Sequence, residues 1–314
     1  GLNSRARYAA TCLTPRDLNS LFEIAQRDQL KVFPLGSGSN LLLHDWIDGI
    51  VLSSIDRSVE IEGVRVTAGA GLSWDELVQI TLASNLFGLE NLSGIPGTVG
   101  AAPMQNIGAY GVELSEMIIG VEVFDLVNNE TRYFDREACQ FGYRTSHFKV
   151  YQAGQYFITK VILELKRHFQ PVLAYSDIAR LPKTQTASGQ SLRSAVLAIR
   201  AGKLPDYNNT PNAGSFFKNP IVTHKMSQDL STRGLRTYSF DGRFKVSAAA
   251  LIQAAGLVGI RSGGVRVSPK HALVFENIGE ATLADIQDLA ARVREAVHTQ
   301  FGVQLEMEPQ GYAV

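Results

Sequence analysis

The sequence predicts a mixed helix-and-strand protein divided into two or three compact units. Its 314 residues exceed the size at which one hydrophobic core normally serves a whole chain. Along the first third, amphipathic helical patterns alternate with short apolar strand patterns. Two glycine-rich stretches, residues 36–40 and 88–111, interrupt these elements. We therefore expect small units whose connecting loops carry the function.

Composition excludes several classes of protein. Hydrophobic residues make up 45% of the chain and charged residues 19%, as in ordinary globular proteins, and the formal net charge is +0. Without a basic excess, we expect neither a nucleic-acid partner nor an anionic membrane partner. No apolar run approaches the roughly 18 residues that span a bilayer, and no signal-peptide pattern opens the chain.

Cysteine usage favours a reducing compartment. Cys12 and Cys139 are the only cysteines, which argues against a disulfide scaffold, so we expect a cytoplasmic protein. Neither cysteine has metal-ligand spacing and the histidines are scattered, so we expect no metal site. The chain starts at Gly1 without a methionine, from which we expect a trimmed N-terminus.

Helices are predicted where apolar residues recur at helical spacing. One follows Thr14, a candidate N-cap with Asp17 three residues later, and another follows Ser73, which forms a candidate capping box with Glu76. We expect the two helices nearest the C-terminus to belong to the core. The predicted helices are residues 15–29, 73–86, 190–202, 246–255 and 283–301, and the predicted strands are residues 31–35, 49–53, 59–61 and 64–67. The expected inward residues of the last two helices are Val246, Ala249, Ala250 and Ala254, then Ile286, Leu289, Ala290, Val293, Ala296 and Val297.

The first glycine-rich stretch, GSGSN at residues 36–40, follows a predicted strand. Two glycines and two serines let backbone amides point at one spot, a nest suited to phosphate oxygens. It is neither a dinucleotide-binding GxGxxG ahead of a long helix nor a Walker loop. A plain tight turn is the alternative interpretation.

The second stretch, residues 88–111, contains six glycines. A core does not tolerate that density, because each glycine costs entropy and fills no volume. Apolar residues such as Leu89, Leu92 and Val99 are interleaved, whereas a flexible surface loop would be more polar. The pattern favours close approach of the backbone to a flat or bulky ligand.

The segment NAGSFFKNP at residues 212–220 places Ser215 among polar side chains. Asn212, Lys218 and Asn219 surround it, as in a loop that presents a hydroxyl. An ordinary Asn/Gly/Ser turn followed by two core phenylalanines is the alternative.

Five segments, in order along nearly the whole chain, resemble motifs of the UDP-N-acetylenolpyruvoylglucosamine reductase family. They are residues 36–40, residues 88–111, YRTSHFK at 143–149, NAGSFFKNP at 212–220 and LEME at 305–308. Within them, SGIPG, NIGAYG and AGSFFKN are together highly specific. Members of this family are FAD enzymes that complete UDP-N-acetylmuramate for bacterial cell walls.

The resemblance implies an α+β fold. Its FAD-binding half is of the vanillyl-alcohol-oxidase/p-cresol-methylhydroxylase type with two subdomains, and a C-terminal α+β substrate-binding domain follows. The implied bounds are residues 1–53, 54–204 and 205–314, the last boundary falling where turn formers gather. The resemblance also implies non-covalent FAD, NADPH as hydride donor and UDP-N-acetylglucosamine enolpyruvate as substrate. We expect a monomer.

The same resemblance assigns the cofactor residues. Residues 36–40 would cradle the FAD pyrophosphate through backbone amides, and residues 95–111 would line the flavin, with Gln105 and Ile107 near the ring. The assigned residues are Gly36, Ser37, Gly38, Ser39, Asn40, Ile95, Pro96, Gly97, Gly100, Gln105, Ile107, Gly108, Ala109 and Gly111.

Three residues match the family's catalytic groups. Arg144 matches an arginine whose planar, permanent charge suits a developing enolate or carboxylate oxygen. Ser215 matches the donor of a proton to C2 of the substrate. Glu308 matches a glutamate that, with Arg144, polarises the enolpyruvyl carboxyl, and this role needs a shared or added proton because adjacent anions repel. Without the motifs, Arg144 would be a surface arginine and Glu308, like Glu306, a solvated tail residue.

Further matches concern the substrate. The chain resembles a longer form of the family in which a tyrosine folds over the substrate, and Tyr175 is the predicted lid residue. Lys203, Asn219 and Tyr238 match UDP-sugar contacts, with Lys245 as a further candidate, since a diphosphate needs cations.

The chain departs from the family pattern after the fourth predicted helix. Val258 stands where a lysine is usual. One phosphate contact is then either missing or supplied by Arg261, Lys270 or His271.

Two other functions compete with the reductase. An oxidase of the same flavin fold would react rapidly with oxygen, often through a histidine-linked FAD, but no Arg-x-x-Gly-His segment is present. A silent flavin- or UDP-sugar-binding module would bind FAD without turnover, and the retained Arg144, Ser215 and Glu308 argue against it.

Overall fold

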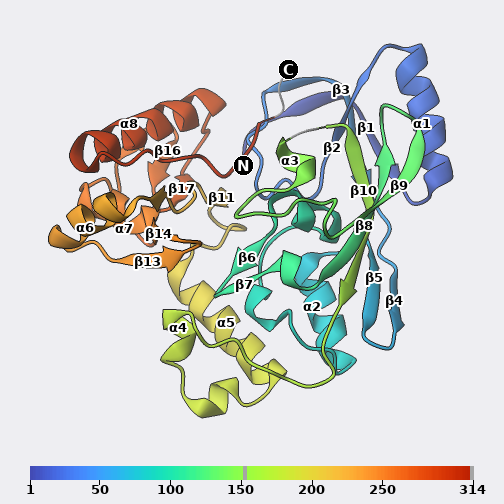
Figure 1. Ribbon diagram of the computed structural model, residues 1–314. Coiled ribbons are helices and arrows are strands. Elements are labelled where there is room, and N and C mark those ends of the chain that lie inside the picture. The colour runs from blue at the N-terminus through green and yellow to red at the C-terminus, as the bar shows by residue number, and fades with distance from the viewer. Residues whose placement is uncertain (151–153, 312–314) are drawn as a thin grey trace. The chain divides into compact units, whose positions relative to one another are not determined.

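The computed structural model describes residues 1–150 and 154–311 (Figure 1). The chain divides into two compact units. The N-terminal unit comprises Ala6–Gly38 and Ile47–Gly202, and the C-terminal unit comprises Lys203–Val314 together with Gly1–Arg5 and Ser39–Trp46. Two early segments therefore belong with the C-terminal residues. The finer three-part division at residues 53 and 204 remains a prediction.

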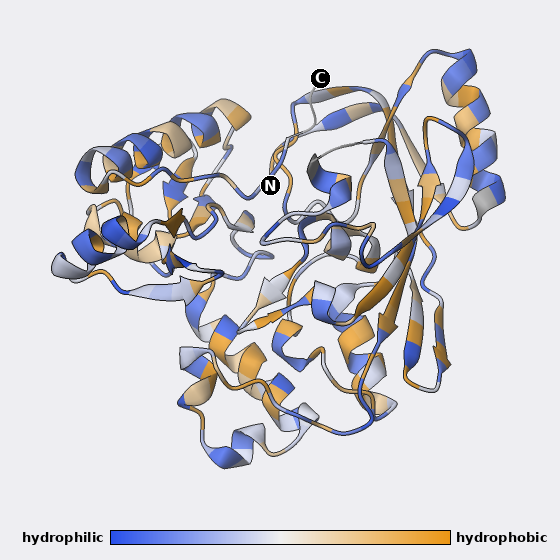
Figure 2. Cartoon of the chain, in the orientation of Figure 1, coloured by the Kyte–Doolittle hydropathy of each residue, from blue (hydrophilic) through white to orange (hydrophobic). Residues whose placement is uncertain are grey.

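Two sheets form the framework of the N-terminal unit. The first has the order β1-β3-β2, with β2 parallel to β3. The second is antiparallel with the order β4-β5-β10-β8-β9. Many residues of its strands are hydrophobic (Figure 2). The strands are β1 (Arg5–Cys12), β2 (Lys31–Pro34), β3 (Trp46–Ser54), β4 (Val59–Glu62), β5 (Arg65–Gly69), β8 (Ile118–Asp125), β9 (Glu130–Asp135) and β10 (Tyr156–Glu164).

Helix α1 begins where the sequence supplies a cap, and α1 and α2 each bury an apolar face. At α1, Thr14 and Asp17 form the capping box, and Leu18 and Phe22 pack against Leu52 in a small hydrophobic cluster. At α2, Trp74, Leu77 and their neighbours join the main core beside the five-stranded sheet. The helices are α1 (Pro15–Arg27), α2 (Trp74–Ala83), α3 (His147–Val150), α4 (Ser176–Ala179) and α5 (Gly189–Lys203).

The glycine-rich stretch is irregular but firmly attached. It is built of the short 3₁₀ helices η1 (Glu90–Leu92), η2 (Val99–Gln105) and η3 (Leu114–Glu116) and the two-residue strands β6 (Gly108–Ala109) and β7 (Val112–Glu113). The indole nitrogen of Trp74 donates to the Leu92 carbonyl at 2.9 Å. Leu92, Val99 and Ile107 are buried in the main core. This stretch is therefore an ordered surface, as its apolar residues predicted.

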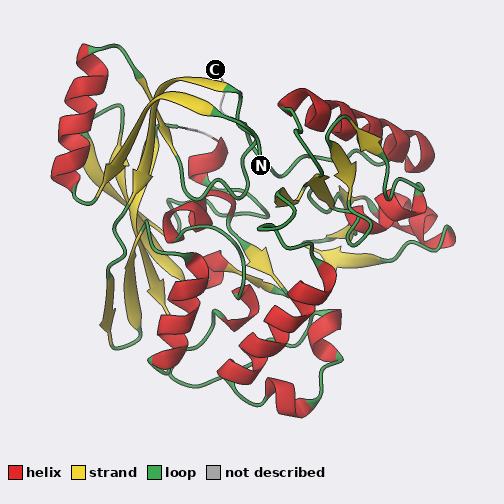
Figure 3. Ribbon diagram, turned by 180° about the vertical axis from the view of Figure 1, so that it is seen from behind, coloured by secondary structure: helices red, strands yellow, loops and turns green. Residues whose placement is uncertain are grey.

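The C-terminal unit packs three helices on two sheets (Figure 3). The sheet orders are β11-β17-β16-β15 and β12-β14-β13, and α8 packs on β15 and β16. Its core includes Phe216, Phe217 and Leu289. The elements are β11 (Asn212–Ser215), β12 (Ile221–Val222), α6 (His224–Thr232), β13 (Thr237–Phe240), β14 (Arg243–Val246), α7 (Ala248–Ala254), β15 (Arg261–Ser262), β16 (Val265–Val267), β17 (Val274–Asn277) and α8 (Leu283–Phe301).

Three local predictions were wrong. Ser73 is the N-cap of α2, but its side chain makes no cap hydrogen bond, and the Glu76 carboxylate is bonded to Arg57. The buried face of α7 is Ala248, Leu251 and Ile252, since Val246 lies in β14 and the helix starts later than its apolar pattern suggested. In α8, Ala296 is only partly buried, while the other predicted inward residues are buried.

Candidate active site

Arg144 lies in the N-terminal unit at the tip of a tight turn. The turn is closed by the Gly142 amide donating to the Thr145 carbonyl at 3.1 Å and by the reverse bond at 3.2 Å. Arg144 has φ 56, a left-handed conformation that costs about 1–3 kcal/mol in a residue other than glycine. Its guanidinium lies 5.3 Å from the centre of the Tyr143 ring. Such strain is typical of a functional position.

The Arg144 side chain is held against the glycine-rich loop. Its Nη2 donates to the Gly108 carbonyl at 2.6 Å. A Cβ on Gly108 would lie 2.8 Å from Arg144 Nη1 and 3.1 Å from the Val112 carbonyl, so glycine is required by space. The structure thus brings together Arg144 and one of the predicted cofactor residues.

Asn106, which sequence reasoning missed, ties this loop to the Arg144 turn. It is fully buried and has φ 48. Its Nδ2 donates to Glu113 at 2.9 Å and to the Gly142 carbonyl at 3.1 Å, and its Oδ1 accepts from the Ser115 amide. The only signal in the sequence was an asparagine within the glycine-rich stretch, since asparagine adopts left-handed conformations more readily than most residues.

The predicted phosphate loop is divided between the two units. Gly36, Ser37 and Gly38 belong to the N-terminal unit, and Ser39 and Asn40 belong to the C-terminal unit. Gly38 has φ 71, so the chain turns as a phosphate-binding nest requires.

Two glycines in the N-terminal unit let neighbouring segments pack closely together. A Cβ on Gly36 would lie 2.9 Å from Thr98 Oγ1 and 3.0 Å from the Ala101 Cβ. At Gly100, a Cβ would meet the Ala70 Cβ at 2.6 Å. Glycine is therefore required at both positions by the packing of the glycine-rich segments on their neighbours.

The remaining cofactor candidates differ in exposure. Ile95, Gln105 and Ala109 are partly buried, whereas Gly111 is exposed. Ile107 is 7% exposed and lies in the main core, and its backbone is hydrogen-bonded to Ala102 and Leu114.

Tyr175 stands at the start of α4 and is exposed. Its ring packs edge-on against Tyr110, with ring centres 5.4 Å apart. Asn91, which was not predicted, holds the two segments together, because its Nδ2 donates to the Tyr110 carbonyl at 2.8 Å and to the Val172 carbonyl at 3.0 Å. Burial raises the pKa of the Tyr110 phenol, opposed by the Arg200 guanidinium that hydrogen-bonds it.

Ser215 lies in the C-terminal unit at the end of β11, between two neighbouring segments. On one side it is paired with Val274 of β17, and the Phe216 amide donates to the Leu273 carbonyl at 2.7 Å. On the other side, the Glu308 amide donates to the Phe216 carbonyl at 2.9 Å. Within this unit the structure therefore places Ser215 and Glu308 on adjacent segments.

A second link joins the same two segments. Phe217 is paired with Met307, and the Lys218 amide donates to the Glu306 carbonyl at 2.9 Å. Lys218 Nζ also forms an ion pair with the Glu306 carboxylate. Glu306 was expected to be a solvated tail residue; its side chain is 74% exposed and also takes part in this ion pair.

Two of the predicted substrate residues in the C-terminal unit lie next to each other. Tyr238 and Lys245 are directly opposite each other on β13 and β14. Lys245 Nζ lies 3.4 Å from the centre of the Phe240 ring, a cation–π contact that orients the lysine.

Asn219 and Lys203 have different settings. Asn219 accepts a hydrogen bond from the Ala248 amide at 2.9 Å, at the start of α7. Lys203 is the exposed last residue of α5.

The region around Val258 contains the proposed substitutes for the usual lysine. Val258 is exposed, as are Arg261 and Lys270. His271 is partly buried, and burial, followed by the Lys203 charge, lowers the pKa of its imidazole. A neutral imidazole is a poorer phosphate ligand than an ammonium group, so Lys270 and Arg261 are the stronger candidates.

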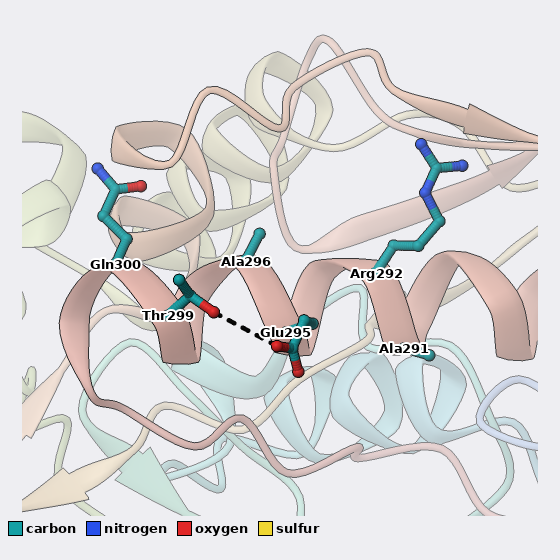
Figure 4. Close-up of a pocket in the computed structure, with 6 residues that line it drawn as sticks. All are labelled: Ala291, Arg292, Glu295, Ala296, Thr299 and Gln300. Carbon is teal, nitrogen blue, oxygen red and sulfur yellow. Dashed lines mark hydrogen bonds between the residues drawn. The ribbon is translucent and has the colours of Figure 1, made fainter.

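A shallow pocket lies on α8, away from these residues in the sequence. Figure 4 shows its lining on a single helix, with the Thr299 hydroxyl bonded to Glu295 at 3.4 Å. The lining residues are Ala291, Arg292, Glu295, Ala296, Thr299 and Gln300. None is a predicted site residue, and the pocket lacks the converging polar groups of an active site.

The described residues offer neither a metal site nor a membrane-spanning helix. Residues 1–150 and 154–311 contain no cluster of His, Cys, Asp and Glu side chains able to hold a metal ion. Among the same residues, no helix has both the length and the apolar character needed to cross a bilayer.

Two family models match the chain. Residues 6–131 match the FAD binding domain, and residues 205–312 match the C-terminal domain of UDP-N-acetylenolpyruvoylglucosamine reductase. The predicted fold class, an FAD-binding half followed by this C-terminal domain, is thereby confirmed.

Relatives match over nearly the full length. The chain is 43% identical to the UDP-N-acetylenolpyruvoylglucosamine reductase of Cupriavidus pinatubonensis, covering 98% of this chain and 94% of that protein. It is 41% identical to the reductase of the same name from Pseudomonas aeruginosa, covering 99% and 95%. A crystal structure of UDP-N-acetylenolpyruvylglucosamine reductase from Thermus caldophilus covers 97% of this chain and 92% of its own, with a TM-score of 0.68 at 27% identity.

An FAD-binding domain joined to this C-terminal domain makes the protein an FAD-dependent oxidoreductase. The chain belongs to the UDP-N-acetylenolpyruvoylglucosamine reductase family.

Proposed function

We propose that this protein reduces UDP-N-acetylglucosamine enolpyruvate to UDP-N-acetylmuramate, with NADPH as the hydride donor, for bacterial peptidoglycan synthesis in the cytoplasm. The observation that carries the proposal is 43% identity over 98% of the chain to a named reductase. FAD, when bound, supplies the hydride-transfer chemistry between NADPH and the enol ether. Backbone amides of residues 36–40 and the surface of residues 95–111 would hold it.

The chain's own groups act on the substrate. Arg144 stabilises negative charge that develops on the enolpyruvyl group, because a guanidinium stays charged and its side chain is held in place by the Gly108 carbonyl. Ser215 donates the proton that C2 receives. Glu308 polarises the substrate carboxyl through a shared proton.

The substrate-binding roles follow the same proposal. Tyr175 covers the bound substrate, and Lys203, Asn219, Tyr238 and Lys245 contact the UDP-sugar. The pairing of Tyr238 with Lys245 supports the last two assignments, because it puts a phenol and an ammonium on neighbouring strands.

The cofactor and the two half-reactions can be tested separately. Acid precipitation of the purified protein should release yellow FAD into the supernatant, as expected for a non-covalent cofactor. In anaerobic stopped-flow, NADPH should bleach the flavin absorbance, and the enolpyruvyl substrate should restore it with formation of UDP-N-acetylmuramate. Reoxidation by oxygen but not by the enolpyruvyl substrate would instead indicate an oxidase.

A further inference from the structure

Asp75 and Arg193 form an ion pair that joins two distant segments of the N-terminal unit. Arg193 Nη1 donates to Asp75 Oδ1 at 2.6 Å, and Nη2 donates to Oδ2 at 2.7 Å. The Arg193 side chain is 8% exposed and that of Asp75 is 28% exposed. Asp75 lies in the first turn of α2 and Arg193 in α5. This is a well-aligned bidentate pair in a largely dry setting, unlike ordinary surface ion pairs.

The same carboxylate also holds the loop at residues 93–97. The Gly94 amide donates to Asp75 Oδ1 at 2.6 Å. Burial acts to raise the pKa of the Asp75 carboxyl, but hydrogen bonds from Arg193 and the Gly94 amide outweigh it and hold the pKa below its ordinary value. The carboxylate therefore stays charged at neutral pH, and its place at a helix N-terminus favours that charge.

Neighbouring contacts leave this loop little freedom. The Trp74 amide donates to the Gly97 carbonyl at 3.1 Å. Gly94 has φ 69, and a Cβ there would lie 2.7 Å from Leu197 and 3.3 Å from Arg200, both on α5. The loop is thus packed on α5 at Gly94, and Asp75 is the charged group that binds both.

We infer that the Asp75–Arg193 pair positions residues 93–97 against the flavin. The pair thereby affects both the affinity for FAD and the environment of the flavin ring. The inference rests on the proposed contact of Ile95, Pro96 and Gly97 with FAD. Asp75 and Arg193 act through the loop and are positioning residues. Without Arg193, the carboxylate would be left partly buried and unpaired, and α2, α5 and the loop would lose their common anchor.

The test uses the full chain with FAD removed and added back. Arg193→Met keeps most of the side-chain volume and removes the charge. We expect the Kd for FAD to rise about tenfold or more, since a charged hydrogen bond is worth that factor or somewhat more. We also expect the visible circular dichroism of the bound flavin to change. Arg193→Lys, which keeps the charge but loses the planar bidentate fork, should recover part of both effects.

A matched control lies next to Asp75 on α2. Glu76 pairs with Arg57 at 2.6 Å, but their side chains are 41% and 64% exposed. Glu76→Gln should leave the FAD Kd within about twofold and the flavin spectrum unchanged, because exposed pairs contribute little. If Arg193→Met lowers the melting temperature while FAD affinity and flavin spectrum match wild type, the pair is structural only and the inference is wrong.

Two further variants keep the inference falsifiable. If Arg193→Met does not fold, Asp75→Asn replaces it, since asparagine can still accept from the Gly94 amide while losing the charge. Ile95→Ala tests the underlying placement of FAD. An unchanged flavin spectrum in Ile95→Ala would overturn that placement and the inference with it. If the spectrum changes in Ile95→Ala but not in the ion-pair variants, only the role of the ion pair is overturned. Neither outcome depends on which substrate reoxidises the flavin.

Discussion

Arg144 and Ser215 are held in opposite ways. Arg144 occupies a strained left-handed turn, and its guanidinium is anchored on the carbonyl of Gly108. Ser215 ends a short strand that is irregular at Gly214 (φ 69), and the backbone around it is bonded to segments on both sides. The comparison teaches that a long charged side chain needs its neighbours to be placed, whereas a short hydroxyl is placed by the backbone that carries it.

The largest expected loss of rate follows from removing the Ser215 hydroxyl. Ser215→Ala should slow reoxidation of reduced flavin by the enolpyruvyl substrate by roughly 10²–10⁴, the range for a positioned general acid. Reduction by NADPH should stay within a few-fold of wild type in stopped-flow. Ser215→Cys should recover part of the rate, because a thiol also donates a proton. Equal losses in both half-reactions would mean that Ser215 shapes the binding site instead.

A slightly smaller effect is expected at the strained turn. Arg144→Lys keeps the charge but loses the planar fork, so substrate-driven reoxidation should fall by roughly 10²–10³ with FAD retained. Arg27→Lys is the matched control, since Arg27 is exposed and pairs with the adjacent Asp28 at 2.7 Å. A full rate in Arg144→Lys would show that charge alone suffices there.

Loss of one phenol oxygen tests the lid. Tyr175→Phe keeps the ring contact with Tyr110, so NADPH reduction of the flavin should be unchanged. The KM for the enolpyruvyl substrate should rise about tenfold, the value of one hydrogen bond to a charged group. Collapse of NADPH reduction would show that Tyr175 instead supports the N-terminal unit.

Substitution of two glycines, one beside Arg144 and one beside Ser215, compares the two regions most directly. Gly108→Ala places a Cβ 2.8 Å from Arg144 Nη1, so it should displace the guanidinium and lower kcat about tenfold or more. Gly214 has φ 69, and no atom of the described residues lies within 4 Å of where its Cβ would stand. Gly214→Ala should therefore cost about 1–2 kcal/mol of stability through its backbone alone. Activity and denaturant unfolding measured on both variants separate the two effects. The reverse pattern would contradict the comparison.

The smallest expected effect is on the pH dependence of folding stability and does not involve the reaction. Glu90 is 4% exposed, its Oε1 has no partner among the described residues, and burial raises the pKa of its carboxyl. The wild-type carboxyl therefore contributes stability below its ordinary pKa of 4.5 and loses that contribution as pH rises through the raised value.

Glu90→Gln removes this pH dependence. It should raise the melting temperature by about 2 °C at pH 8 and have no benefit near pH 4. Thermal unfolding at both pH values measures the difference. An equal gain at both would show that Glu90 is not protonated on acidification.

Much of the framework followed from local sequence. The capping box of Thr14 and Asp17, the apolar periodicity of α8 and the strand patterns of β2 to β5 each depend on residues close together in the chain. The family followed from ordered motifs such as SGIPG and AGSFFKN, which are specific because several spacings must agree at once. The predicted capping box of Ser73 and Glu76 is absent: the Ser73 side chain makes no cap bond, and Glu76 is bonded to Arg57, which lies 19 positions away in the sequence.

The sequence by itself determined where most helices and strands lie, where glycine-rich loops interrupt them, and which family the motifs resemble. Only the tertiary structure decided the bidentate pairing of Asp75 with Arg193, the anchoring of Arg144 on Gly108, and the pairing of the Ser215 strand with residues 306–308. The physical reason is range. Capping and periodicity act within a few residues, whereas these contacts join residues separated by tens of positions, and no local pattern specifies which distant group arrives.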